Sequence, residues 1–96
     1  MRIVEQDFIL TPSGDGDPTF NLQLMLPVLD KKKNTTTMKM KEVAYNISIS
    51  RAAIMIIQNR VENHFGDSDI SFSEYVDKYK EECQKICKAL KIRFKV

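Results

Sequence analysis

The residues of this 96-residue chain that could hold a metal ion are one histidine, His64, and two cysteines, Cys83 and Cys87. A structural zinc site takes a full tetrahedral set of Cys and His ligands, and its cysteines usually flank a turn. Here the cysteines lie within one helical pattern, and the set stays incomplete unless a carboxylate joins it. We therefore expect Cys83 and Cys87 to be small core residues with free thiols, and we expect no metal site.

Two acids in a loop are the next candidates for chemistry. Asp15 and Asp17 flank a glycine in the segment TPSGDGDPT, residues 11–19, as calcium-binding oxygens can do. An EF-hand loop, however, needs a bidentate acid at its last position, which is Leu26 here. Pro, Gly, Asp and Ser at this density are typical of a turn. No nucleophile-elbow, metalloprotease or phosphate-loop motif occurs elsewhere, so we expect a noncatalytic protein without a cofactor.

The charges are unevenly distributed, although the net charge is only +2. Residues 31–41 contain five lysines and no acid, and residues 78–96 contain seven bases against two acids. Segments with such an excess of one charge often bind a partner. The alternative is that the lysines only keep a hairpin tip and a tail soluble. The candidate partner-binding residues are Lys31, Lys32, Lys33, Lys39, Lys41, Asp15, Asp17, Lys91, Arg93 and Lys95.

The candidates between Asp15 and Lys41 must be positioned by strands in the first half of the chain. Apolar residues recur at every second position up to about residue 48, and at every third or fourth position after it, which predicts strands followed by helices. Pro27 lacks a backbone donor and is expected to end the second strand. The alternation slips between Lys41 and Val43, which predicts a β-bulge. The expected strands are 2–10, 20–26 and 38–47.

Capping residues mark the helices of the second half. Ser48 is the expected N-cap of the first helix, and Gly66 its left-handed end. Ser71 and Glu74 form the S-x-x-E capping box that opens the second helix. The expected helices are 49–65 and 72–90.

Together these elements predict a single α+β domain over residues 1–96. We expect a three-stranded antiparallel sheet covered on one face by two helices. The alternating tail KIRFKV, residues 91–96, indicates either a short basic edge strand or a tail that becomes a strand when a partner offers an edge. The amino-terminal MRIVEQDF carries acids where a signal peptide would be apolar, and no apolar run approaches the roughly 20 residues of a membrane span. We therefore expect a cytoplasmic protein that makes no membrane contact.

Several short motifs carry a family resemblance. They are Tyr45-Asn46-Ile47-Ser48-Ile49, then Ala53, Ile56 and Arg60, then Ser71-Phe72-Ser73-Glu74-Tyr75 with Tyr79. With these motifs, the chain from Val43 onward resembles small accessory proteins encoded by phages and prophages of Gram-positive bacteria. Anti-CRISPR proteins are one subgroup of that class. Many of them are strongly acidic, whereas this chain is slightly basic.

The resemblance implies a protein of the bacterial host's cytoplasm that blocks a host or defence protein, such as a CRISPR nuclease, by occupying its surface. The residues leave a second interpretation open, in which the lysine-rich hairpin and the basic tail bind the phosphates of a nucleic acid. Against it, we expect the aromatic side chains to lie in packed stripes, and only one arginine, Arg93, lies in the basic segments. Pairing of two copies through the sheet is also left open.

Overall fold

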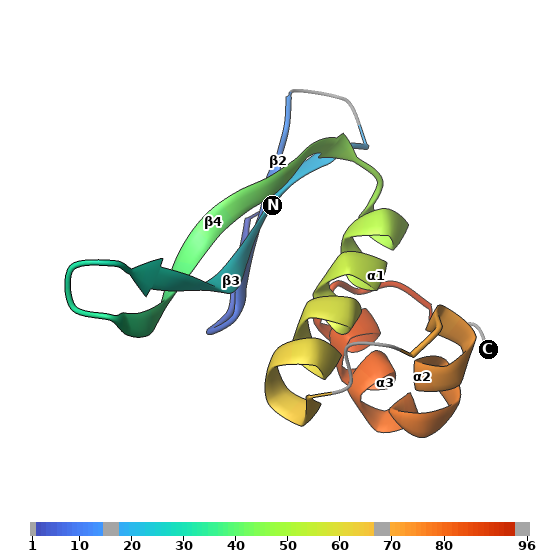
Figure 1. Cartoon of the computed structure of the whole chain (residues 1–96). Coiled ribbons are helices and arrows are strands. Elements are labelled where there is room, and N and C mark those ends of the chain that lie inside the picture. Colours follow the sequence, from blue (N-terminus) through green and yellow to red (C-terminus); the bar gives the residue numbers. More distant parts are fainter. Residues whose placement is uncertain (1, 15–17, 67–69, 94–96) are drawn as a thin grey trace. The chain divides into compact units, whose positions relative to one another are not determined.

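The computed structural model describes residues 2–14, 18–66 and 70–93 (Figure 1). It confirms the α+β class: an antiparallel sheet of order β1-β2-β3-β4 comes first and helices follow. The chain divides into two compact units, Met1–Ser48 with the sheet and Ile49–Val96 with the helices. The single domain expected over residues 1–96 stays a prediction. The strands are β1 (Ile3–Val4), β2 (Phe8–Pro12), β3 (Phe20–Asp30) and β4 (Thr35–Ile47).

The expected first strand, 2–10, is wrong, because the structure divides it into β1 and β2. The N–H of Glu5 donates to the carbonyl oxygen of Phe8 at 2.9 Å and closes a tight turn between them. β1 then pairs antiparallel with β2, with Ile3 opposite Leu10. Glu5, Gln6 and Asp7 between the two strands are polar, and polar residues of this kind favour a turn over a buried strand.

The expected end of the second strand at Pro27 is also wrong, because β3 continues to Asp30. Pairing between β2 and β3 ends at Leu24, so among the described strands only β4 lies beside the rest of β3. The N–H of Met25 donates to Asp7 on the β2 side at 2.9 Å. Backbone groups two residues apart along a strand face the same side, so the nitrogen of Pro27 faces the free edge. A proline there costs no ladder hydrogen bond.

The predicted β-bulge lies at Val43 and is confirmed. Leu22 pairs with Ala44, whereas its neighbour Gln23 pairs with Glu42, so Val43 is the extra residue on β4. Such an insertion changes which face of the sheet the following side chains occupy.

A second irregularity follows in the same strand, where Asn21 faces both Tyr45 and Asn46. Asn46 has a φ of 54°, in the left-handed region that asparagine tolerates better than most residues. Its N–H donates to the side-chain oxygen of Asn21 at 3.1 Å. β4 is therefore regular only up to Glu42.

The second unit has more helical segments than the two that we expected. The first helix becomes a π-helical segment at Val61, and Gly66, with a φ of 73°, confirms the predicted left-handed end. The second helix is interrupted at Tyr79, where φ is −115° and ψ is 40°. The segments are α1 (Ile49–Arg60), η1 (Val61–Phe65), α2 (Phe72–Lys78) and α3 (Lys80–Ala89).

The ends of the helices follow local rules. Ser71 accepts the N–H of Glu74 at 3.3 Å, which confirms the predicted cap of α2. α1 begins at Ile49, directly after Ser48. The expected strand over 91–96 is wrong at residues 91–93, because the N–H of Ile92 donates to the carbonyl of Cys87 and closes the end of α3. Residues 94–96 lie outside the described residues.

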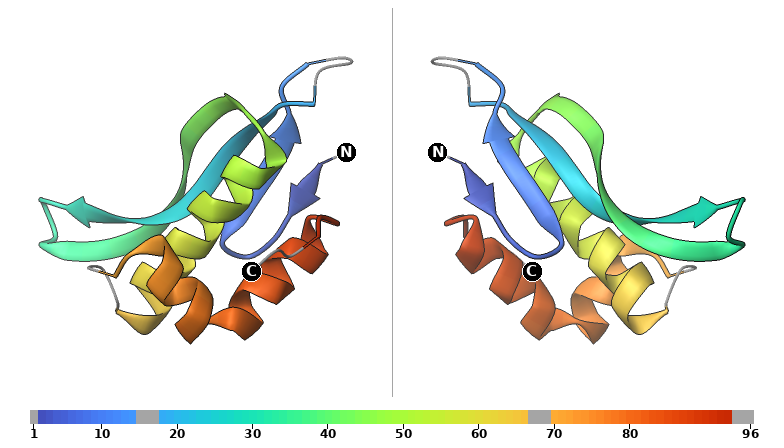
Figure 2. Two further views of the ribbon diagram at one scale, coloured as in Figure 1. Left: turned by 90° about the vertical axis from the view of Figure 1, so that its right-hand side faces the viewer. Right: turned by 90° about the vertical axis from the view of Figure 1, so that its left-hand side faces the viewer.

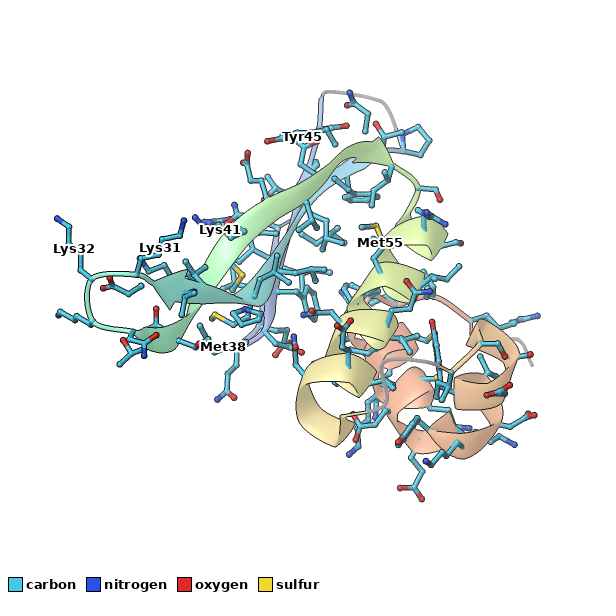
Figure 3. All side chains as sticks on the ribbon, viewed as in Figure 1. Lys31, Lys32, Met38, Lys41, Tyr45 and Met55 are labelled. Carbon is cyan, nitrogen blue, oxygen red and sulfur yellow. The ribbon has the colours of Figure 1, made fainter. Side chains whose placement is uncertain are left out.

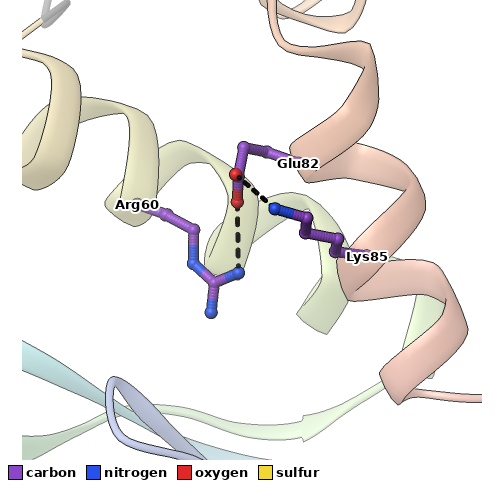
Figure 4. Close-up of polar contacts among 3 residues, drawn as sticks. All are labelled: Arg60, Glu82 and Lys85. Carbon is purple, nitrogen blue, oxygen red and sulfur yellow. Dashed lines mark hydrogen bonds and ion pairs between the residues drawn. The ribbon is translucent and has the colours of Figure 1, made fainter.

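The second unit has its own apolar stripes and polar contacts. Ile56 and Ile57 on α1 and Ile86 on α3 are buried, and α1 contacts α3. Glu82 of α3 joins two cations, Arg60 of α1 at 3.5 Å and Lys85 at 3.3 Å (Figure 4). The other buried residues of this unit are Ala52, Ala53, Val61, Tyr75, Cys83, Cys87 and Leu90.

Candidate functional site

The β3–β4 hairpin of the first unit extends beyond the pairing between β2 and β3. Beyond Leu24 the two strands pair only with each other, and the pairing continues to Asp30 opposite Thr35. Figure 2 shows β3 and β4 continuing together well past β2. We call residues 25–40 the ribbon.

Residues 31–34 form the turn at the tip of the ribbon. The side chain of Asp30 accepts the N–H of Lys32 at 3.0 Å, and Asn34 has a left-handed φ of 50°. Both features are typical of tight turns, where a short polar side chain substitutes for a strand hydrogen bond. The turn therefore sets the register of the whole ribbon.

One face of the sheet carries the buried residues of the first unit, and we call it the core face. Phe8 lies opposite Leu24, and Leu10 lies opposite Leu22; all four are buried. Side chains alternate between the two faces along a strand, and directly opposed residues share a face. Lys41 lies opposite Leu24, so it belongs to the core face. By the same register, Leu26, Val28 and Lys39 also belong to it.

We call the opposite face the open face. Gln23 belongs to it, because Gln23 lies between the buried Leu22 and Leu24 on β3 and side chains alternate between the two faces. Gln23 lies opposite Ile9, and Ile9 lies opposite Val4, so Val4 is on the open face. Gln23 also lies opposite Glu42, whose carboxylate accepts the hydroxyl hydrogen of Tyr45. Tyr45 therefore belongs to the open face as well.

Methionines and a leucine continue the open face along the ribbon. Met25 lies opposite Met40, and Pro27 lies opposite Met38. Leu29 follows Pro27 at the next outward position of β3. The large hydrophobic residues that are exposed in the described part of the chain all belong to this face: Val4 (58%), Leu29 (57%), Met38 (49%) and Tyr45 (59%).

The predicted hairpin lysines do not form a single patch. Lys31, Lys32 and Lys33 are exposed in the turn, whereas Lys39 and Lys41 are exposed on β4. In Figure 3, Lys31 and Lys32 lie at the tip of the ribbon and Lys41 lies further along the strand, on the opposite side from Met38.

The remaining candidates belong to other segments of the chain. Lys91 and Arg93 are exposed at the end of the helical unit. Asp15, Asp17 and Lys95 lie outside the described residues. Within the described part of the first unit, the structure places the hairpin members of the set on one hairpin and divides them between its turn and β4.

Sequence reasoning missed the open face. Tyr45 was expected in a packed stripe, and this is wrong, because its side chain is exposed. The signal was present in the slip of alternation: Met38 and Met40 have one parity, and Tyr45 has the other. The bulge at Val43 accounts for this slip, and it places all three side chains on one face.

The ionisable groups of the described residues show no nucleophile in an activating environment. Burial raises the pKa of Cys83 and also that of Cys87, so both thiols stay protonated and unreactive near neutral pH. Burial raises the pKa of Tyr75. The hydrogen bond with Glu42 raises the pKa of Tyr45. These shifts have structural causes and do not identify an acid or a base for catalysis.

Other kinds of site find little support in the described ranges. There, no three His, Cys, Asp or Glu residues gather where they could hold a metal ion. None of the helices in the same ranges has the length and hydrophobicity that spanning a bilayer requires. A shallow depression lies at the junction of α2 and α3, lined by residues 78–82. It is only partly enclosed, whereas most ligand sites bury the greater part of their ligand.

Comparison of the chain with protein-family models, with curated proteins and with solved structures gave no match. The function must therefore be argued from the residues themselves.

Proposed function

We propose that this chain is a noncatalytic protein that binds a partner protein through the open face of its sheet. The proposal depends on one observation: the exposed large hydrophobic residues of the described chain, Val4, Leu29, Met38 and Tyr45, all share that face. Folded proteins usually scatter such residues singly, and a group of them on one surface marks an interaction site. Methionines add an adaptable contact surface, because their side chains are flexible and polarisable.

The proposed action is to cover a surface of the partner, which requires no chemical step. The partner in this proposal is a host or defence protein of a bacterium, such as a CRISPR nuclease, and the binding occurs in the cytoplasm. Support for this choice comes from the motifs between residues 43 and 79 that resemble phage and prophage accessory proteins. The open face supports protein binding in general.

An affinity capture from nuclease-treated bacterial lysate tests the proposal. The wild-type chain is compared with Leu29→Asn/Met38→Asn, which makes the open face of the ribbon polar without changing its charge. The matched control is Thr35→Asn/Thr37→Asn, because Thr35 lies opposite Asp30 on the core face of the same ribbon. Circular dichroism and urea unfolding verify that all three proteins fold.

We expect the wild type and the threonine control to retain the same partner, and the open-face variant to lose it. Retention by all three proteins, or loss from both variants alike, would contradict docking through the open face. Loss of the partner on nuclease treatment would instead favour the second candidate.

That second candidate is a small nucleic-acid-binding protein. The observation that favours it is that the five hairpin lysines are all exposed, four of them on the two-stranded ribbon and Lys41 directly beside it. A ribbon of this kind fits the major groove, and its lysines can neutralise phosphates without reading bases. The salt dependence of binding distinguishes nucleic-acid binding from protein docking.

A further inference from the structure

The outer edge of β4 is free in the described sheet. The strand order β1-β2-β3-β4 leaves β4 with a neighbour on one side only. From Thr35 to Glu42 its pairing with β3 continues without a bulge. This segment therefore presents a regular row of outward backbone N–H and C=O groups, which is the template that an added strand requires.

The side chains along this edge differ between the two faces. Met38 and Met40 belong to the open face, whereas Lys39 and Lys41 belong to the core face. Both lysines are exposed, and the chain has no acid between Lys31 and Lys41. An added strand would thus meet apolar side chains on one face and positive charge on the other.

The same lysines disfavour three of the registers in which a second copy of this chain could pair with the edge. Antiparallel pairing of two β4 edges centred on Met40 would place Lys39 of one copy opposite Lys41 of the other. Pairing centred on Lys39 or on Lys41 would place that lysine opposite itself. Like charges in directly opposed positions destabilise a strand pair, so the edge is complementary to an acidic strand.

We propose that the edge of β4 between Thr35 and Glu42 binds an extended segment of a partner protein in which acidic and apolar residues alternate. The acidic residues lie beside Lys39 and Lys41, and the apolar residues extend the open face beside Met38 and Met40. Backbone hydrogen bonds supply the affinity, and the alternating side chains supply the selectivity. This inference rests on the proposed protein-binding function and names the chemistry of the partner.

A synthetic peptide of about eight residues that alternates valine and glutamate is a direct probe, because its length matches the regular part of the edge. The control peptide has lysine in place of each glutamate. Fluorescence anisotropy of the labelled peptides measures their binding to the full chain. We expect the glutamate peptide to bind and the lysine peptide not to bind. No binding of the glutamate peptide, or equal binding of both, would overturn the proposal.

Charge reversal on the protein tests the position of the site. Lys39→Glu/Lys41→Glu should weaken binding of the glutamate peptide by about tenfold or more and allow the lysine peptide to bind. Lys31→Glu/Lys33→Glu makes the same change in net charge at the turn, and we expect less than about a threefold effect. Equal effects of the two variants would mean that only bulk charge matters, which would overturn the edge site.

The backbone test uses two N-methylated forms of the glutamate peptide. In an added strand, every second amide nitrogen faces β4 and the others face away from it. Each form carries methyl groups on one of these two sets. Strand addition predicts that one form binds normally and the other does not. Equal binding of both forms would overturn it, and so would a dimer in sedimentation that the peptide does not dissociate. If the peptide fails while the lysate partner still requires Leu29 and Met38, the edge inference alone is wrong.

Discussion

Leu24 and Leu29 lie on the same strand but on opposite faces of the sheet, so alanine at each position should affect stability very differently. The side chain of Leu24 is 5% exposed and that of Leu29 is 57% exposed. Truncation of a fully buried leucine removes its transfer free energy and leaves a cavity, which together cost about 3–5 kcal/mol. We expect Leu24→Ala to lower the free energy of unfolding by about this amount.

The expected cost at Leu29 follows from its exposure. Full burial of a leucine side chain contributes about 1.5–3 kcal/mol, and folding removes less than half of this side chain from water. Leu29→Ala should therefore cost about 1 kcal/mol or less. For a chain of this size, each 1 kcal/mol changes the melting temperature by about 4–8 °C. The two variants should thus differ in melting temperature by roughly 10 °C or more.

Urea unfolding followed by circular dichroism measures both values, and the slope of the transition reveals any change in the surface exposed on unfolding. Equal destabilisation by the two substitutions would refute the assignment of the two faces. It would mean that Leu29 is buried in solution and that the open face is already occupied.

Three further predictions concern a helix cap, the thiols and the ribbon lysines. Ser71→Ala removes the oxygen that accepts the N–H of Glu74 and should cost about 1 kcal/mol in urea unfolding, whereas Ser71→Gly should cost only a few tenths. Cys83 and Cys87 should react with a thiol reagent at pH 8 only after unfolding. Because burial raises their pKa values above the ordinary 9.0, stability should be fully present below pH 9 and should decrease as the pH rises beyond it, as a pH series of melting temperatures would show. If the protein binds duplex DNA, affinity should fall steeply with salt, and Lys39→Gln/Lys41→Gln should reduce the slope of log K against log salt by about 2; a flat salt response would exclude phosphate binding.

Several features of the fold were predictable because they depend on neighbours in the chain. The cap at Ser71 and the left-handed end at Gly66 are local, since each satisfies hydrogen bonds within one turn of helix. The bulge at Val43 was predictable from a break in alternation, because each side chain must take one face or the other. The burial of the two cysteines followed from their place in a helical stripe.

Other features depended on pairing between distant residues. The expected end of β3 at Pro27 failed because a proline costs a hydrogen bond only where a neighbouring strand would receive it, and β2 stops short of that position. The assignment of Lys39 and Lys41 to the face opposite Met38 depends on the β3–β4 register. The number and order of charges along the chain do not indicate which face of the sheet each lysine occupies.

The chemistry-bearing residues divide in the same way. The sequence by itself determined the class of fold, the absence of a recognised catalytic motif and the concentration of lysines in one hairpin, because composition and local periodicity express these properties directly. Only the tertiary structure decided which side chains share a surface. Cross-strand register and the bulge at Val43 place Val4, Leu29, Met38 and Tyr45 on one open face, since a strand's side chains acquire neighbours only when another strand pairs beside it.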